Sequence, residues 1–193
     1  MVKKAHEELG RIDFLVNNAT GAIHAMSDIP VSNKAEPLLD DRYLERWNRV
    51  ISVDLTGAIL CIRQVVPLML AAKSGRIVNI SSIAALNGMD PPGYAAAKAG
   101  LLGLTMSLAV RLAPYIQVNA VLPGFVSSLD HDPELVSKLT PGKKMGTPED
   151  IAEVVGDIIS AKSNYLTGSC IIVDGGVMSG GLGYAAGHVS HRE

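Results

Sequence analysis

Residues 76–82 read Arg-Ile-Val-Asn-Ile-Ser-Ser, a run rich in β-branched residues that ends in two hydroxyl side chains. β-Branched side chains fit the pleated surface of a sheet, so this run predicts a strand. Similar apolar runs occur at residues 12–16, 116–122 and 170–173, with helix-length segments between them. Strands that alternate with helices favour a parallel sheet with crossover helices on both faces.

Helices are expected in the segments between these strands, and several residues mark their ends. Gly10 suits the left-handed position just past a helix terminus. Pro67 is expected to bend its helix, and Gly75 to end it. Thr147, followed by proline and two acids, is a typical helix start. The expected helices cover residues 2–9, 41–52, 55–73, 94–112 and 147–160.

Length and composition predict one domain. The 193 residues are 48% hydrophobic and 4% aromatic, enough for a sizeable aliphatic core. The 17 basic and 19 acidic residues nearly balance, so no basic surface suggests nucleic-acid binding. We expect a core over residues 1–176, a glycine-rich tail over 177–193, and small molecules or other protein chains as partners.

The two cysteines, Cys61 and Cys170, lie in apolar runs far apart in the sequence. Two buried thiols are therefore expected, rather than a disulfide or a metal site. The longest uncharged run, residues 112–129, contains prolines and amides that a membrane helix would not readily accommodate. The residues after Met1 lack the apolar core of a secretion signal. A cytoplasmic protein without membrane contact is the expectation.

Tyr94 and Lys98 are spaced four residues apart in an expected helix, which places them on the same face. A nearby ammonium favours the phenolate form of tyrosine. Ser82, at the end of the preceding strand, could donate a hydrogen bond to a substrate oxygen beside the phenol. The Tyr-x-x-x-Lys spacing also occurs by chance on many helices, so by itself it is a weak motif.

Further motifs occur in a fixed order along the chain. They are Asn17-Asn18-Ala19, Ser82, Tyr94-x-x-x-Lys98, Pro123-Gly124 and Asp174-Gly175-Gly176. In this order they resemble the signatures of the short-chain dehydrogenase/reductase family, and the resemblance covers nearly the whole chain. It implies a Rossmann-like, doubly wound α/β fold. It also implies an enzyme that interconverts a ketone and a secondary alcohol with NAD or NADP.

The resemblance also assigns roles to single residues. In the family the tyrosine is the general acid and base, the lysine lowers its pKa and binds the nicotinamide ribose, and the serine orients the substrate carbonyl. These roles transfer to Tyr94, Lys98 and Ser82. Ser82 precedes Tyr94 by twelve residues, one fewer than is usual, so Ser81 is a weaker candidate.

Two further segments resemble cofactor-binding parts of the family. Residues 123–128 resemble the nicotinamide clamp, which implies contacts from Pro123, Gly124, the Val126 amide and the Ser128 hydroxyl. Residues 17–19 resemble the segment on the adenosine side. For Asn17 and Asn18 capping of the strand end is an equally good interpretation. His188 and His191 lack a third ligand nearby, so no metal site is expected.

The chain departs from the family pattern at two positions near these motifs. Thr20 stands where the family has glycine, and Asp54 where it commonly has an asparagine that helps to hold a water on a proton relay. The Asp54 carboxylate could still accept a hydrogen bond from such a water. It could instead pair with Lys98, which would stabilise the ammonium and change the relay.

The glycine-rich turn and the ribose-reading residue of the family are missing ahead of residue 12. The resemblance implies the strand order 3-2-1-4-5-6-7, of which this chain would keep 4-5-6-7. We therefore expect an N-terminally truncated sheet with an exposed apolar edge at residues 12–16. The choice between NAD and NADP is not readable, and a start upstream of Met1 is a further alternative.

Two functions compete at this level. The first is an NAD(P)-dependent ketone and alcohol oxidoreductase with Ser82, Tyr94, Lys98 and Asp54 in the catalytic site. The second is a truncated, non-catalytic homologue that serves as an interaction or assembly module. The resemblance also implies a homo-oligomer formed through the helices at residues 55–73 and 94–112. Residues 22–40 and 125–146 would shape the substrate pocket.

Overall fold

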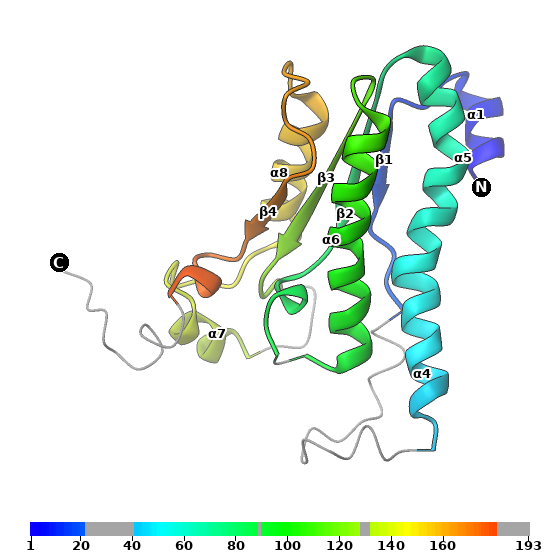
Figure 1. The fold of residues 1–193 in the computed structure, drawn as a ribbon. Coiled ribbons are helices and arrows are strands. Elements are labelled where there is room, and N and C mark those ends of the chain that lie inside the picture. The colour runs from blue at the N-terminus through cyan, green and yellow to red at the C-terminus, as the bar shows by residue number, and fades with distance from the viewer. Residues whose placement is uncertain (22–40, 89, 128–131, 181–193) are drawn as a thin grey trace.

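The computed structural model describes residues 1–21, 41–88, 90–127 and 132–180. Its centre is a single four-stranded parallel sheet in the order β1-β2-β3-β4 (Figure 1). This confirms the predicted parallel α/β fold, and all four strands lie where the sequence indicated. The strands are β1 (Phe14–Asn17), β2 (Gly75–Ile80), β3 (Ile116–Pro123) and β4 (Cys170–Val173).

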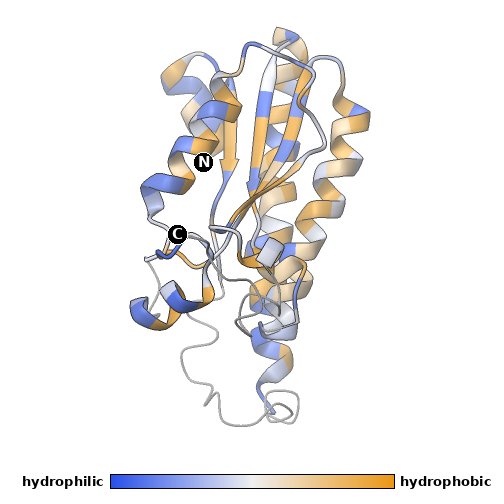
Figure 2. Cartoon of the chain, turned by 90° about the vertical axis from the view of Figure 1, so that its left-hand side faces the viewer, coloured by the Kyte–Doolittle hydropathy of each residue, from blue (hydrophilic) through white to orange (hydrophobic). Residues whose placement is uncertain are grey.

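Helices cover both faces of this sheet. The helices are α1 (Val2–Leu9), α4 (Tyr43–Val50), the π-helical turn η1 (Ile51–Thr56), α5 (Gly57–Ala72), the 3₁₀ turn η2 (Ile83–Ala85), α6 (Pro92–Leu112), α7 (Pro133–Leu139) and α8 (Pro148–Ser160). Figure 2 shows the largely apolar strands between α8 on one side and the long α5 and α6 helices on the other.

The core has two layers because successive residues of a strand point to opposite faces. On one face Ile77 and Val118 pack against Ile62 and Val65 of α5. On the other face Val78 packs with apolar residues of α8. The central strands β2 and β3 are buried almost throughout, as expected for parallel strands covered on both sides.

Residues 43–72 form one continuous helix, so the prediction of two helices at 41–52 and 55–73 was wrong. The π-helical turn η1 joins α4 to α5 without a break. The helix ends when Lys73 adopts the left-handed conformation, with φ of 53°. Gly75 is therefore not the residue that ends it. Gly75 begins β2, at a point where any side chain would meet Met69.

Other local expectations had mixed outcomes. Gly10 ends α1 in the left-handed conformation, with φ of 76°, as predicted. Cys170 is exposed on the edge strand β4 and Cys61 is half-buried, so the expectation of two buried thiols was wrong. The segment from residue 125 to 146 contains α7, which starts at the Asp132 cap and buries Val136.

The strand β1 forms one edge of the sheet and shows apolar side chains to solvent. Phe14 is 49% exposed and Val16 is 41% exposed. This confirms the exposed apolar edge that the sequence predicted. Among the described residues no strand pairs with the outer side of β1, and an edge strand with apolar side chains favours contact with another chain.

Two helical segments, Tyr43–Ala72 and Pro92–Leu112, are long and apolar enough to cross a membrane by length and composition alone. Core helices of water-soluble folds meet the same criteria. Both segments pack against the sheet in this structure, through Ile62 on α5 and Ala109 on α6. Their apolar character is thus accounted for in part by the core.

The start of α8 gives a first test of the fold. Thr147 Oγ1 accepts a hydrogen bond from the Asp150 amide, and Asp150 Oδ2 accepts one from the Thr147 amide. Thr147→Ala removes one of these bonds and is expected to lower the free energy of unfolding by about 1 kcal/mol. Urea denaturation followed by circular dichroism measures the change.

The matched control for this test is Glu153→Ala, an exposed position inside the same helix. It should change the free energy of unfolding by less than about 0.5 kcal/mol. An equal loss of stability in both variants would contradict the capping role of Thr147.

A second test concerns the contact between the ends of β3 and β4. A Cβ atom at Gly124 would lie 2.8 Å from the Asp174 Cα, which is backbone and cannot rotate away. Gly124→Ala is expected to lower the free energy of unfolding by roughly 1–3 kcal/mol. Gly156→Ala lies inside a helix, where an added Cβ atom would meet no atom within 4 Å beyond the neighbouring helix backbone, and it should instead stabilise by up to about 1 kcal/mol. Similar thermal unfolding curves for the two variants would refute this contact.

Candidate functional site

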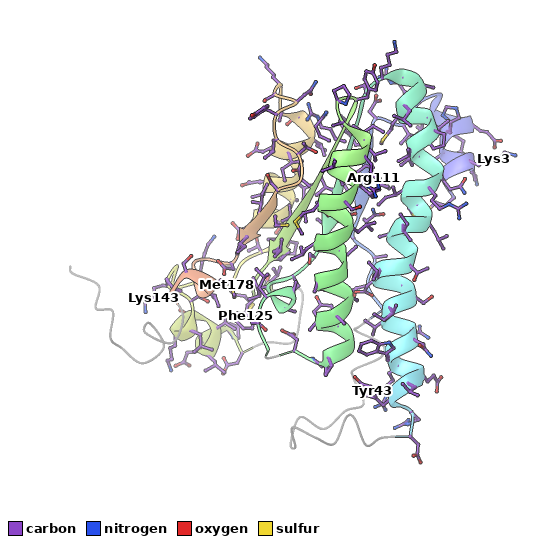
Figure 3. The ribbon with its side chains drawn as sticks, in the orientation of Figure 1. Lys3, Tyr43, Arg111, Phe125, Lys143 and Met178 are labelled. Atoms are coloured by element: carbon purple, nitrogen blue, oxygen red, sulfur yellow. The ribbon has the colours of Figure 1, made fainter. Side chains whose placement is uncertain are left out.

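The carboxyl ends of the four parallel strands meet at one edge of the sheet, the usual ligand edge of such folds. Strand β2 leads there into Ser81 and Ser82, and β3 into Gly124. Helix α6 begins near this edge, so its first turns bring Tyr94 and Lys98 close to the strand ends. The segments around Phe125, Lys143 and Met178 lie at the same edge (Figure 3).

The two neighbouring serines have different surroundings. Ser81 is buried, and its hydroxyl donates a hydrogen bond to the Lys98 carbonyl oxygen at 2.8 Å. Ser82 caps η2 by accepting a hydrogen bond from the Ala84 amide at 3.1 Å, and its side chain is close enough to the Tyr94 phenol to affect its pKa. Of the two, only Ser82 is placed beside the phenol.

The Tyr94 phenol lies in a mostly buried position at the start of α6. Burial raises its pKa above the ordinary value, while the hydrogen bond with Ser82 acts in the opposite direction. The negative charges of Asp90 and Asp54 raise the pKa further. The net direction is opposite to the lowering expected from Lys98, because burial makes the largest contribution to the pKa of Tyr94.

Lys98 is held by two groups below the phenol ring. Its Nζ lies 3.2 Å from Asp54 Oδ2 and donates a hydrogen bond to the Ile80 carbonyl oxygen at 3.2 Å. The same Nζ lies 5.4 Å from the centre of the Tyr94 ring. Burial lowers the pKa of Lys98, and Asp54 opposes this through its charge and its hydrogen bond.

Asp54 connects Lys98 to the turn that follows β1. Its Oδ2 accepts a hydrogen bond from Thr20 Oγ1 at 2.8 Å, and its Oδ1 accepts one from the Gly21 amide at 2.6 Å. The carboxylate is buried within the π-helical turn η1, an irregularity that is frequent at functional sites. Of the two arrangements considered for Asp54, the structure shows the pair with Lys98.

The two strand-end asparagines have different surroundings. Asn17 donates a hydrogen bond to Asn79 Oδ1 at 2.8 Å, and Asn79 donates in turn to Thr105 Oγ1 at 2.9 Å. This chain ties β1, β2 and α6 together, which is a structural role. Asn18 and Ala19 are exposed at the ligand edge, where a cofactor could reach them.

The sequence interpretation missed Asn79 and Thr105, although both are fully buried polar residues. A polar side chain in the middle of an apolar strand was the available signal at Asn79. Buried amides require partners, so such a position predicts a hydrogen-bonded network even before the partner is known.

The segment after β3 is fixed to β4 and to the loop before α8. The Gly124 amide donates to the Val173 carbonyl at 2.9 Å, and the Ser127 amide donates to the Gly146 carbonyl at 2.9 Å. Val126 is buried in this bridge. Asp174 accepts hydrogen bonds from two amides of the following turn. Ser128 lies outside the described residues.

These groups fit the nicotinamide end of a dinucleotide. Phenol, hydroxyl and ammonium groups lie together at the end of β2 and the start of α6, and the rigid turn at Gly124 lies at the same edge. Among the described residues no group of three metal-ligating side chains is close enough to hold a metal ion. His188 and His191 lie outside the described residues.

Comparisons with known proteins agree with this fold. The sequence profile of the enoyl-(acyl carrier protein) reductase family matches residues 1–178. The chain is 37% identical to 3-oxoacyl-[acyl-carrier-protein] reductases of Synechocystis and of Thermotoga maritima, over 92% of this chain and 70% and 71% of those proteins.

Solved structures show the same similarity. An acetoin dehydrogenase from Salmonella typhimurium superimposes with a TM-score of 0.73 and 32% identity, over 92% of this chain and 69% of that one. The profile match, the sequence identity and the shared fold are consistent with one another. The chain therefore belongs to the short-chain dehydrogenase/reductase family of oxidoreductases.

Proposed function

We propose that this protein interconverts a ketone and a secondary alcohol with a nicotinamide cofactor. The observation that carries the proposal is the cluster of Ser82, Tyr94 and Lys98. The Ser82 hydroxyl is close enough to the Tyr94 phenol to affect its pKa, and the Lys98 ammonium lies 5.4 Å from the centre of the phenol ring. A proton donor, a hydroxyl for orientation and a cation thus lie together at the ligand edge of the sheet.

The groups of this chain have separate tasks in ketone reduction. A bound reduced nicotinamide would supply the hydride that adds to the carbonyl carbon. Tyr94 Oη gives its proton to the carbonyl oxygen, so that C=O becomes CH–OH. The Ser82 hydroxyl donates a hydrogen bond to the same oxygen and holds it beside the phenol. Five residues are proposed to contact the cofactor, with Lys98 at the ribose hydroxyls: Asn18, Ala19, Lys98, Gly124 and Val126.

The raised pKa of Tyr94 suits the reductive direction, because the phenol stays protonated at neutral pH and can act as an acid. Reduction is then retained below this pKa and lost as the pH rises through it. The relatives named for reduction of 3-oxoacyl groups suggest a 3-oxoacyl thioester as the first substrate to test.

The exposed edge strand β1 favours a second candidate, an assembly module without catalytic activity. The observation that supports this candidate is the exposure of Phe14 and Val16 to solvent, because a strand of another chain could cover them. Turnover by the purified chain alone would rule this candidate out. The candidate would be supported if the chain forms a stable complex with a longer family member and shows no turnover, either alone or in that complex.

The helices α5 and α6 are proposed to form a homo-oligomer interface. Their outward faces expose Leu60, Met106 and Val110. Val110→Glu would place a charge in that interface and is expected to shift the protein to a smaller species in light scattering at micromolar concentration. Ala152→Glu, at an exposed position on α8, serves as the control and should leave the oligomeric state unchanged. A wild-type monomer would contradict the proposed interface.

The catalytic proposal is tested by Tyr94→Phe, which removes the proton donor and keeps the ring. Turnover of a 3-oxoacyl thioester, followed by the absorbance of the reduced nicotinamide, is expected to fall by at least about 100-fold. Tyr165→Phe, at a residue that is 97% exposed, is the matched control and should retain wild-type turnover. Wild-type protein that neither turns over ketones nor binds NAD(H) or NADP(H) would overturn the proposal.

A further inference from the structure

The two departures from the family pattern, Thr20 and Asp54, meet in one contact. Thr20 Oγ1 donates to Asp54 Oδ2 at 2.8 Å, and the same carboxylate oxygen lies 3.2 Å from Lys98 Nζ. Asp54 is 2% exposed and Lys98 is 4% exposed. The pair is therefore shielded from solvent, where its charges interact more strongly than at a surface.

The chemistry of this contact requires a carboxylate rather than an amide. The Thr20 hydroxyl, the Gly21 amide and the Lys98 ammonium all donate toward Asp54. A carboxylate has acceptor sites for all three donors. An asparagine has one acceptor oxygen, and its NH₂ group would face one of these donors. Threonine at position 20 and aspartate at position 54 are thus chemically matched to each other.

We propose that Thr20 and Asp54 act together as positioning residues that fix the Lys98 ammonium and cancel its charge beside Tyr94, so that Tyr94 serves as a proton donor. This inference rests on the proposed reductase function, because it assigns Tyr94 the acid role. The neutral Asp54–Lys98 pair then replaces an uncompensated cation below the phenol.

The other groups that face Tyr94 act in known directions. Asp90, in the segment before α6, raises the pKa of Tyr94, as does Asp54 from η1. The Ser82 hydrogen bond lowers it, and burial raises it most. Among the described residues, the positively charged group beside the Tyr94 ring is Lys98, which lies on α6 itself. Removing the Asp54 charge leaves that cation unopposed, which favours the phenolate.

The experiment titrates the Tyr94 phenol in the protein without substrate or cofactor. The phenolate absorbance of each protein is measured against pH, and the curve of the same protein carrying Tyr94→Phe is subtracted. Asp54→Asn is expected to shift the Tyr94 titration to lower pH. The double variant Thr20→Gly with Asp54→Asn restores both family residues and should show the same shift, which keeps the test available if the single variant does not fold.

Thr20→Gly alone keeps the carboxylate and removes one of its hydrogen bonds. Its Tyr94 titration should therefore shift less than that of Asp54→Asn. The contribution of Thr20 appears in urea unfolding, where Thr20→Gly should destabilise the protein that has Asp54 more than the protein that has Asp54→Asn. A purely structural role of Asp54 would change stability and leave the phenol titration unmoved.

The possible outcomes separate this inference from the proposed function. A shift to lower pH in the Asp54 variants supports the inference, even if no protein turns over a ketone and the reductase proposal fails. An unchanged Tyr94 titration in the double variant overturns the inference, even if turnover of the wild type confirms a reductase. Additive effects of the two substitutions on unfolding would overturn the joint role of Thr20.

Discussion

The central strand β2 imposes the main constraint on this structure. It pairs with a neighbour on each edge and is buried on both faces, so every polar backbone group must be satisfied within the sheet. Helices have to cover both faces of β2, so a ligand can approach this strand only at its ends. Because the strands are parallel, residues from distant parts of the sequence converge at the carboxyl edge, where Ser82 and Gly124 lie.

Lys98 extends this constraint into the electrostatics of the candidate site. Lys98 and Asp54 are both removed from water, and the cost of burying each charge is offset only if they remain paired and hydrogen-bonded. The Ile80 carbonyl and the Thr20 hydroxyl supply those additional bonds. The pair therefore couples the end of β2, the turn after β1 and the helix α6 into one unit.

Much of the fold was predictable because local signals agreed with the tertiary structure. The β-branched runs predicted all four strands, and Thr147 marked the start of α8. The single helix at residues 43–72 was missed, because a π-helical turn has no residue signature comparable to a glycine cap. The motif predicted Tyr94 and Lys98 as neighbours. The direction of the Tyr94 pKa was missed, because it depends mainly on burial and also on the charges of Asp90 and Asp54.

The π-helical turn has a consequence for how this sequence can vary. A turn of this kind holds an extra residue within an otherwise regular helix. Loss of one residue between Ile51 and Thr56 would let this segment close into a regular α-helix, with Val50 and the core face of α5 still directed to the same side. The segment should therefore accept the loss of one residue more readily than a regular helical turn would. Such a loss would instead displace the Asp54 carboxylate from the turn after β1.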